Sequence, residues 1–279
     1  MTTPAFEGLE NTVIAETYRI TGKLGAGGMG SIYEAEHVRM GRKFALKLLD
    51  PTFAENEEVF QRFKREAEIA GQLGHPNIVE VVDFNRTEQG VPYIVMEKLI
   101  GMDLADWIAN KGAFTFQTAY PVLCEVVDAL EAAHAAGVVH RDMKPQNIFL
   151  CEKGRRHDYA KLLDFGISKM KQSSSIVTKT NAVMGTPYYM SPEQAEGKNT
   201  EIDSRTDIYA LGAILYEMLT GKLAFYAPSV PTAMFKVCYE EPEPIADLVP
   251  NLPAGLSEVL AKALAKDKEE RYASARALG

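Results

Sequence analysis

The 279-residue chain has few cysteines, no surplus of positive charge and no long apolar run. Its three cysteines, Cys124, Cys151 and Cys238, are widely spaced and odd in number, which fits neither a metal motif nor a disulfide framework. Buried free thiols in a reducing compartment are the simpler interpretation. A net charge of −8 argues against a general nucleic-acid or anionic-membrane binder.

The sequence also lacks a secretory signal and a membrane span. The first ten residues, MTTPAFEGLE, are acidic and contain no apolar core. The richest apolar stretch, residues 211–219, is interrupted by Glu217 and falls well short of the roughly 18 residues that a span needs. We therefore expect a cytoplasmic segment without membrane contact of its own.

The first third of the chain predicts strands and one helix. Period-two patterns and flanking turn residues indicate five strands. A helical pattern occupies residues 57–73, where Phe60, Phe63 and Ala67 recur at helical spacing and Gly74 ends the run. The five predicted strands begin near residue 18 and then cover residues 31–36, 43–49, 78–84 and 92–97. Together these elements predict a small, mostly antiparallel lobe.

After Gly101 the pattern becomes helical, and a larger helical lobe is expected. The change falls near residues 97–101, and a cleft between the two lobes is the expected ligand site. The predicted helices cover residues 118–136, 207–219, 234–239 and 256–265.

The most informative stretch is residues 140–147, His-Arg-Asp-Met-Lys-Pro-Gln-Asn, followed by Asp164-Phe165-Gly166. Asp142, Lys144 and Asn147 offer a base, a cation and a metal ligand at fixed offsets, and Asp164 offers a second metal ligand. Phosphoryl transfer needs an aligned nucleophile and neutralisation of spreading negative charge, and it needs little covalent help. The order of these residues matches the general template for that chemistry.

These motifs resemble the protein kinase family, and the resemblance covers nearly the whole chain. It implies an α+β, two-lobed protein-kinase fold with a small β-rich N-lobe that carries one main helix and a larger helical C-lobe. Residues 1–17 would flank an N-lobe of residues 18–97 and a C-lobe of residues 98–279, with one catalytic domain over 18–276. The Met-Gly-Ser-Ile-Tyr hairpin and the Gly-Thr-Pro-Tyr-Tyr-Met-Ser-Pro-Glu segment resemble bacterial eukaryotic-like serine/threonine kinases. Such domains often begin a longer, sometimes membrane-anchored protein.

The resemblance implies catalytic roles for individual residues. Asp142 would accept or orient the substrate hydroxyl proton, and Lys144 would neutralise the transferred group. Asn147 and Asp164 would bind Mg²⁺, with Mn²⁺ as an alternative, because oxygen donors suit a hard cation. Lys47 would hold the ATP phosphates and pair with Glu66, although Glu68 competes for that pairing.

The glycine cluster at residues 25–30 fits G-x-G-x-x-G, a weak pattern when taken alone. A dinucleotide-binding fold and a plain hairpin turn are the alternatives. A strand follows here, and Lys47 follows that strand, so we favour a hairpin at Gly25, Gly27 and Gly30 that approaches the phosphates closely. Matches to the adenine and ribose positions of the family are Ile32, Ala45, Met96, Glu97, Leu99, Phe149 and Asp103. Asp103 equally suits a helix N-cap.

Four further residues match structural positions of the family. Glu193 would pair with Arg271, Asp207 would anchor the catalytic loop, and Thr186 would link Asp142 to Lys144. Ala70, one turn after Glu66, is smaller than the bulky residue that is usual there.

The function we predict is a serine/threonine protein kinase that uses ATP and acts on protein substrates. We expect it to phosphorylate itself at Thr178 and Thr180, with a homodimer as the arrangement for phosphorylation in trans. A pseudokinase scaffold and a small-molecule kinase of related fold are the alternatives. The first would be expected to lose Lys47, Asp142, Asn147 or Asp164, and the second would not be expected to carry the long Ser/Thr-rich loop that ends in Ser-Pro-Glu.

Overall fold

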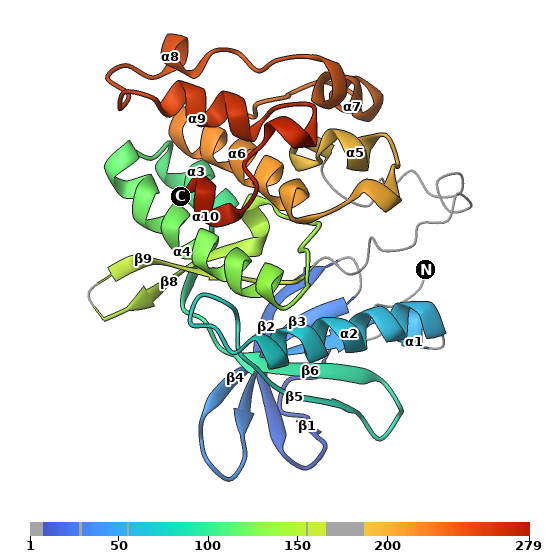
Figure 1. Ribbon diagram of the computed structural model, residues 1–279. Helices are drawn as coiled ribbons and strands as arrows, with labels where there is room; N and C mark the ends of the chain where they lie inside the picture. Colours follow the sequence, from blue (N-terminus) through green and yellow to red (C-terminus); the bar gives the residue numbers. More distant parts are fainter. Residues whose placement is uncertain (1–7, 28–29, 55, 155, 166–186) are drawn as a thin grey trace. The chain divides into compact units, whose positions relative to one another are not determined.

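The computed structural model describes residues 8–27, 30–54, 56–154, 156–165 and 187–279. The chain divides into two compact units, Met1–Ile100 and Gly101–Gly279 (Figure 1). Strands dominate the first unit and helices dominate the second. The predicted change of character near residues 97–101 therefore coincides with the division between the units.

Unit 1 is built on a six-stranded antiparallel sheet in the order β1-β2-β3-β4-β6-β5. Its strands are β1 (Val13–Ile14), β2 (Tyr18–Gly27), β3 (Gly30–His37), β4 (Lys43–Leu49), β5 (Val81–Arg86) and β6 (Pro92–Glu97). Strand β1 was not predicted, because two residues are too few to show alternation. It pairs with the start of β2 and lies within the segment that we expected to flank the lobe.

The register of the sheet separates two faces. Cross-strand partners share a face, and Tyr33, Leu46 and Val95 are partners across β3, β4 and β6. They belong to a buried core that also contains Tyr18 and Phe44, whose rings meet edge to face. The opposite face carries the residues that alternate with these, and it is there that the candidate site residues of unit 1 lie.

Helix α2 (Glu57–Leu73) covers part of that opposite face, and its predicted bounds are confirmed. The Asn56 side chain accepts hydrogen bonds from two first-turn amides, and Gly74 ends the helix at φ 50°, a conformation that suits glycine. Phe63 and Ala67 are buried in a cluster with sheet residues Leu49 and Ile94. A short helix, α1 (Pro51–Ala54), precedes α2.

Unit 2 is organised around α6 (Ser204–Thr220), whose residues are buried on nearly every side. A helix that is apolar all round lies at the centre of a helical domain. The other helices are α3 (Leu104–Lys111), α4 (Phe116–Ala135), α5 (Pro192–Ala195), α7 (Val230–Tyr239), α8 (Ile245–Leu248), α9 (Leu256–Ala263) and α10 (Ala275–Leu278). Helix α7 begins four residues before its predicted start, because Ser229 caps it and proline is tolerated in a first turn.

A three-stranded sheet, β7 (Gly101–Asp103), β8 (Ile148–Lys153) and β9 (Arg156–Leu162), completes unit 2. Strand β9 packs against α4 (Figure 1). The candidate catalytic loop therefore leads directly into β8, and Asp164 follows β9. None of the helices in the described parts of the chain is long and apolar enough to cross a membrane.

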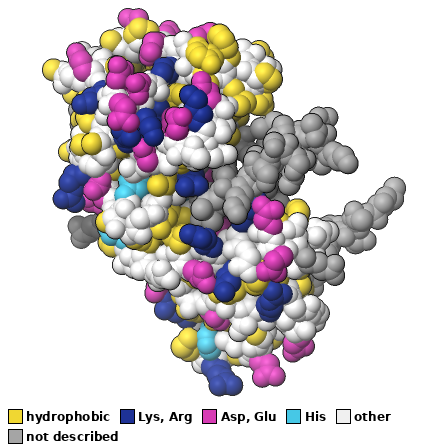
Figure 2. Space-filling view, turned by 45° about the vertical axis from the view of Figure 1, so that its right-hand side comes forward, with side chains coloured by type: hydrophobic (Ala, Val, Ile, Leu, Met, Phe, Trp, Pro, Cys, Tyr) yellow, Lys and Arg dark blue, Asp and Glu magenta, His cyan; other side chains and the backbone are white. Residues whose placement is uncertain are grey.

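Acidic and basic side chains are interspersed on the face of the molecule shown in Figure 2.

One buried ion pair joins two distant parts of unit 2. Arg271 donates two parallel hydrogen bonds of 2.9 Å to the carboxylate of Glu193, and Thr206 donates a third of 2.7 Å. The side chains of Arg271 and Glu193 are 0% and 5% exposed. This confirms the predicted pairing. Burial raises the pKa of Glu193, but the hydrogen bonds and charge of Arg271 outweigh it and hold that pKa below its ordinary value of 4.5.

Replacing Arg271 by methionine should lower the free energy of unfolding by about 3–5 kcal/mol, because it leaves a buried carboxylate without its partner. The difference from the wild type should shrink as the pH falls below 4.5, since Glu193 has a lowered pKa in the folded state and this contribution is lost on protonation. Urea unfolding at several pH values measures both effects. Arg276→Met, at an exposed position, is the matched control; equal losses in the two variants would contradict the prediction.

Candidate active site

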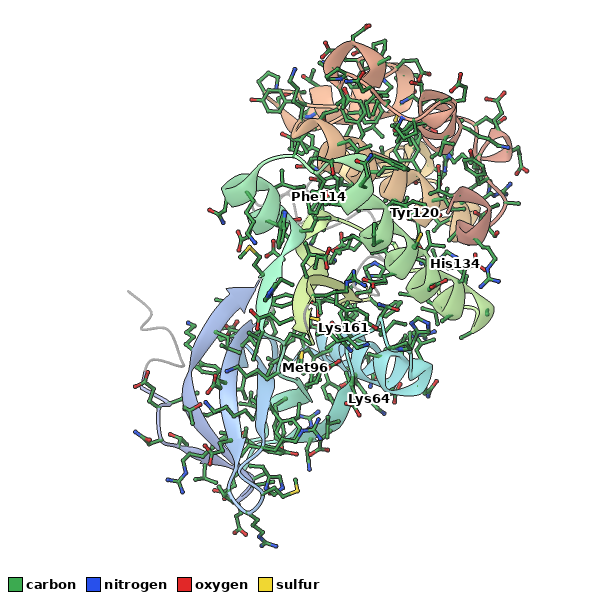
Figure 3. All side chains as sticks on the ribbon, turned by 90° about the vertical axis from the view of Figure 1, so that its left-hand side faces the viewer. Lys64, Met96, Phe114, Tyr120, His134 and Lys161 are labelled. Carbon is green, nitrogen blue, oxygen red and sulfur yellow. The ribbon has the colours of Figure 1, made fainter. Side chains whose placement is uncertain are left out.

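The loop at residues 140–147 is anchored by a buried carboxylate. Asp207, in the first turn of α6, is fully buried. It accepts hydrogen bonds of 2.8 Å from the backbone amides of His140 and Arg141, and a third of 2.8 Å from Nε2 of His134. His134 belongs to the last turn of α4 (Figure 3). The predicted anchoring by Asp207 is confirmed, whereas the contribution of His134 was not predicted.

Arg141 has a backbone conformation that is uncommon for residues other than glycine, with φ at 66°. Its N–H is bound by Asp207 and its carbonyl accepts a 2.8 Å hydrogen bond from Gln194. Such conformations persist only where the surroundings over-determine them. The two hydrogen bonds offset the strain and direct the chain into Asp142.

Gln194 was missed by the sequence reasoning, although a signal for it exists. Ser191 and Gln194 form a capping box at the start of α5, and Ser-x-x-Gln is the pattern for that motif. The capping box fixes Gln194, whose amide then reaches back to the carbonyl of Arg141.

His140 is fully buried and has a definite tautomer. Its Nδ1 accepts a hydrogen bond of 3.3 Å from the amide of Asp142, so the proton resides on Nε2, which donates to the carbonyl of Leu163 at 3.0 Å. Its ring lies 4.9 Å from that of Phe165, which is buried. His140 therefore ties the loop to the segment that carries Asp164.

The three candidate catalytic side chains of this loop lie together. Lys144 Nζ is 2.9 Å from Asp142 Oδ2, and the amide nitrogen of Asn147 donates to the Asp142 carbonyl at 2.7 Å. Asn147 is buried, whereas the side chains of Asp142 and Lys144 are 18% and 25% exposed. The base candidate is thus reachable, while the asparagine is fixed.

The donor set fits a hard divalent cation. With its amide nitrogen engaged, Asn147 has its side-chain oxygen as the remaining ligand atom. Leu163 N–H binds the Asn147 carbonyl at 2.8 Å, so Asp164 follows directly on a residue that is tied to Asn147. Asp164 has a positive φ of 37°, which is uncommon for a residue other than glycine. No cluster of three His, Cys, Asp or Glu side chains that could hold a metal occurs in the described residues. Two oxygen donors match a cation that takes its other ligands from water and phosphate.

Unit 1 brings the lysine and glutamate candidates together. Lys47 Nζ lies 2.6 Å from Glu66 Oε1, and their side chains are 14% and 19% exposed. Glu68, the competitor, instead pairs with Lys64 at 3.5 Å. Strand β4 places Lys47 on the sheet face that α2 covers, so Glu66 reaches it from the helix.

The three glycines of the hairpin differ in their structural setting. A Cβ at Gly30 would lie 1.9 Å from the carbonyl oxygen of Leu48, so the pairing of β3 with β4 itself requires glycine. At Gly25 and Gly27, a Cβ would meet no described atom within 4 Å, and neither residue has a positive φ. Packing and backbone conformation therefore do not account for glycine at these two positions.

The candidate adenine and ribose residues divide between the units. In unit 1, Ala45 lies opposite Met96 and Ile32 lies opposite Lys47 in the sheet register, on one face; Met96 is labelled in Figure 3. Glu97 and Leu99 follow Met96. In unit 2, Asp103 lies opposite Phe149. The Asp103 carboxylate accepts from the amide of Asp106 at 2.8 Å, which confirms the N-cap; burial raises its pKa.

Thr178, Thr180 and Thr186 lie outside the described residues, as do Gly166 and Lys169.

The chain matches the model of the protein kinase domain over residues 18–279 and belongs to that family. It is 41% identical over 264 residues to a probable serine/threonine-protein kinase of Clostridium perfringens, covering 95% of this chain and 37% of the relative. It is 40% identical over 258 residues to the serine/threonine-protein kinase Pkn1 of Myxococcus xanthus, covering 92% and 36%. The chain thus spans well under half the length of these relatives. The kinase domain of Mycobacterium tuberculosis PknI superposes with a TM-score of 0.71 at 28% identity, over 96% of this chain and 95% of that one. The predicted two-lobed kinase fold is confirmed.

Replacing Asp207 by asparagine should loosen the catalytic loop. Asparagine keeps one acceptor oxygen in place of two, so at least one of the three donors loses its partner. We expect a loss of about 1–3 kcal/mol in the free energy of unfolding and faster hydrogen exchange at the amides of His140 and Arg141. Asp128→Asn, at an exposed position of α4, is the control. Unchanged exchange at both amides would show that Asp207 does not anchor the loop.

Proposed function

We propose that this domain transfers the γ-phosphoryl group of ATP to serine and threonine hydroxyls of proteins. The observation that carries the proposal is the loop in which Asp142, Lys144 and Asn147 lie together on a backbone held by Asp207. Membership of the protein kinase family and the names of the bacterial relatives support it.

Asp142 is the group that orients the substrate hydroxyl and accepts its proton. Its carboxylate is partly exposed, and its position is fixed by the strained, doubly bound Arg141 that precedes it. Lys144, whose Nζ lies 2.9 Å from the Asp142 carboxylate, would neutralise charge on the transferred group. Asn147 and Asp164 would hold a Mg²⁺ ion, which when bound would add to the neutralisation of the phosphate oxygens.

The residues of unit 1 act on the nucleotide. Lys47, oriented by Glu66, binds the α- and β-phosphates. Gly25 and Gly27, where packing does not demand glycine, let the backbone approach the phosphates. Ile32, Ala45 and Met96 contact the adenine ring, as does Phe149 of unit 2. The backbones of Glu97 and Leu99 meet the edge of the adenine, and Asp103 contacts the ribose hydroxyls.

The pseudokinase alternative is disfavoured because Lys47, Asp142, Asn147 and Asp164 are all present. A small-molecule kinase is disfavoured by the long Ser/Thr-rich segment before Ser191-Pro192-Glu193.

We place the domain in the cytoplasm, and we propose that two copies meet transiently for phosphorylation in trans.

Asp142→Asn should lower the rate of phosphoryl transfer by about 10²–10⁴-fold. The fold and the affinity for Mg-ATP should stay close to those of the wild type. Asp164→Ala should in addition weaken Mg-ATP binding, because it removes a metal ligand. Peptide phosphorylation assays and calorimetric titration with Mg-ATP measure the two effects, with Asp128→Asn as the control. Near-normal turnover in Asp142→Asn would refute the assignment of the base.

We also propose that phosphorylation of Thr178 and Thr180 activates the domain. A phosphate adds about −1.5 to −2 charges and strong acceptors. Arg141 directly precedes the catalytic base and places a cation beside the site, and Lys169 and Arg62 match positions that meet this phosphate in related kinases. Arg62 is paired with Glu58, so a phosphate would compete with that carboxylate.

The variant that carries both Thr178→Ala and Thr180→Ala should be several-fold less active than the wild type. Mass spectrometry of protein made with and without active Asp142 locates the modified sites. Unchanged activity of the double variant would exclude the switch, even if both threonines were found modified.

A further inference from the structure

A cluster of polar side chains centred on Glu34 joins four segments of unit 1. The Glu34 carboxylate binds Lys98, accepts a hydrogen bond of 2.7 Å from Lys43 and accepts another of 3.1 Å from the hydroxyl of Thr21. Thr21 belongs to β2, Glu34 to β3 and Lys43 to β4, while Lys98 follows the end of β6. The motif matches did not single out any member of this cluster.

The cluster is more enclosed than an ordinary surface ion pair. The side chains of Glu34 and Lys98 are 16% and 23% exposed, whereas that of Lys43 is 55% exposed. The hydrogen bonds from Lys43 and Lys98 lower the pKa of Glu34 to about 2. Glu34 is therefore ionised throughout the physiological pH range and holds both lysines.

The sheet register places Glu34 beside the candidate adenine residues. Glu34 lies opposite Ala45 on β4, and Ala45 lies opposite Met96 on β6, so the three form one row on one face. Ile32, two residues before Glu34 on β3, lies on the same face. Glu34 thus lies in the row that carries the proposed adenine contacts, between Ala45 of β4 and Gly22 of β2.

Lys98 is the central residue of residues 97–99, which we call the connecting segment. Its neighbours Glu97 and Leu99 are those whose backbones are proposed to meet the adenine edge. The Glu97 amide donates to the carbonyl of Glu80 at 3.0 Å, and the Glu97 carboxylate accepts from the Glu80 amide at 2.9 Å. The segment is therefore tied to the start of β5 on one side and, through Lys98, to β3 on the other.

We propose that Glu34 is a positioning residue for nucleotide binding. It holds the backbone of the connecting segment through Lys98 and thereby sets the affinity of the domain for ATP. Glu34 touches neither the nucleotide nor the transferred group in this proposal, which rests on the proposed adenine contacts of Glu97 and Leu99. A segment already ordered before binding loses less conformational freedom when the nucleotide binds, so the tie contributes to affinity.

The test compares Glu34→Gln, Lys98→Met and the double variant with the wild type. Each single variant should raise the KM for ATP and the Kd of Mg-ATP roughly tenfold, which corresponds to about 1.4 kcal/mol. kcat and the KM for a peptide substrate should stay within twofold of the wild-type values. The double variant should lose no more affinity than either single variant, because both substitutions break the same tie.

Glu36→Gln is the matched control, since Glu36 lies on the same strand and face and the substitution removes the same charge. Thermal unfolding of the nucleotide-free proteins separates affinity from stability. Unchanged Kd values in Glu34→Gln and Lys98→Met would overturn the proposal, whether or not the melting temperature falls. The proposal would also be overturned if the double variant lost as much binding free energy as the two single variants together. If the wild type binds Mg-ATP but transfers no phosphoryl group, the proposed function fails, while the pattern of Kd values still decides the role of Glu34.

Discussion

The carboxylate of Asp207 is the constraint on which the candidate catalytic loop depends. A fully buried carboxylate is costly unless its oxygens are occupied, and here three donors from two segments occupy them. Two of these donors are consecutive backbone amides, so the carboxylate fixes the path of the main chain as well as a side chain. The uncommon conformation of Arg141 is tolerated because its N–H and its carbonyl are both bound. The position of Asp142 follows from that path.

The rest of unit 2 supports this arrangement by holding the partners of the loop. Helix α6 carries Asp207 and is buried on nearly all sides, so the carboxylate cannot shift without disturbing the core. Helix α5 carries Gln194, and Glu193 beside it is fixed by Arg271 from near the end of the chain. Glu193 and Gln194 are consecutive residues of α5, so the ion pair that fixes Glu193 also helps to position Gln194, which binds Arg141. In unit 1, one sheet provides both the core and the candidate site. One face forms the core, while the other presents Lys47, Ala45 and Met96 in a fixed register.

Much of the fold and of the candidate site could be predicted from the sequence. Helix α2 was predicted to the residue, because it has an apolar stripe and a terminating glycine, both of which are local signals. The loop at residues 140–147 was recognised because its chemistry is concentrated in consecutive residues. The two-residue strand β1 escaped, since it exists only through its pairing with β2. The start of α7 was misplaced because the apolar pattern begins later than the cap at Ser229.

The sequence by itself determined which residue types are available to the chemistry and roughly where helices and strands form, since periodicity, caps and turns are properties of neighbouring residues. The tertiary structure decided between two neighbouring charges, and it confirms the expected pairing of Lys47 with Glu66. Glu66 and Glu68 share one helix, yet only Glu66 faces Lys47, because the helical turn directs Glu68 to Lys64. The ties from His134 to Asp207, from Gln194 to Arg141 and from Glu34 to Lys98 join residues 53 to 73 positions apart. Such contacts depend on how elements pack, and no local pattern records them.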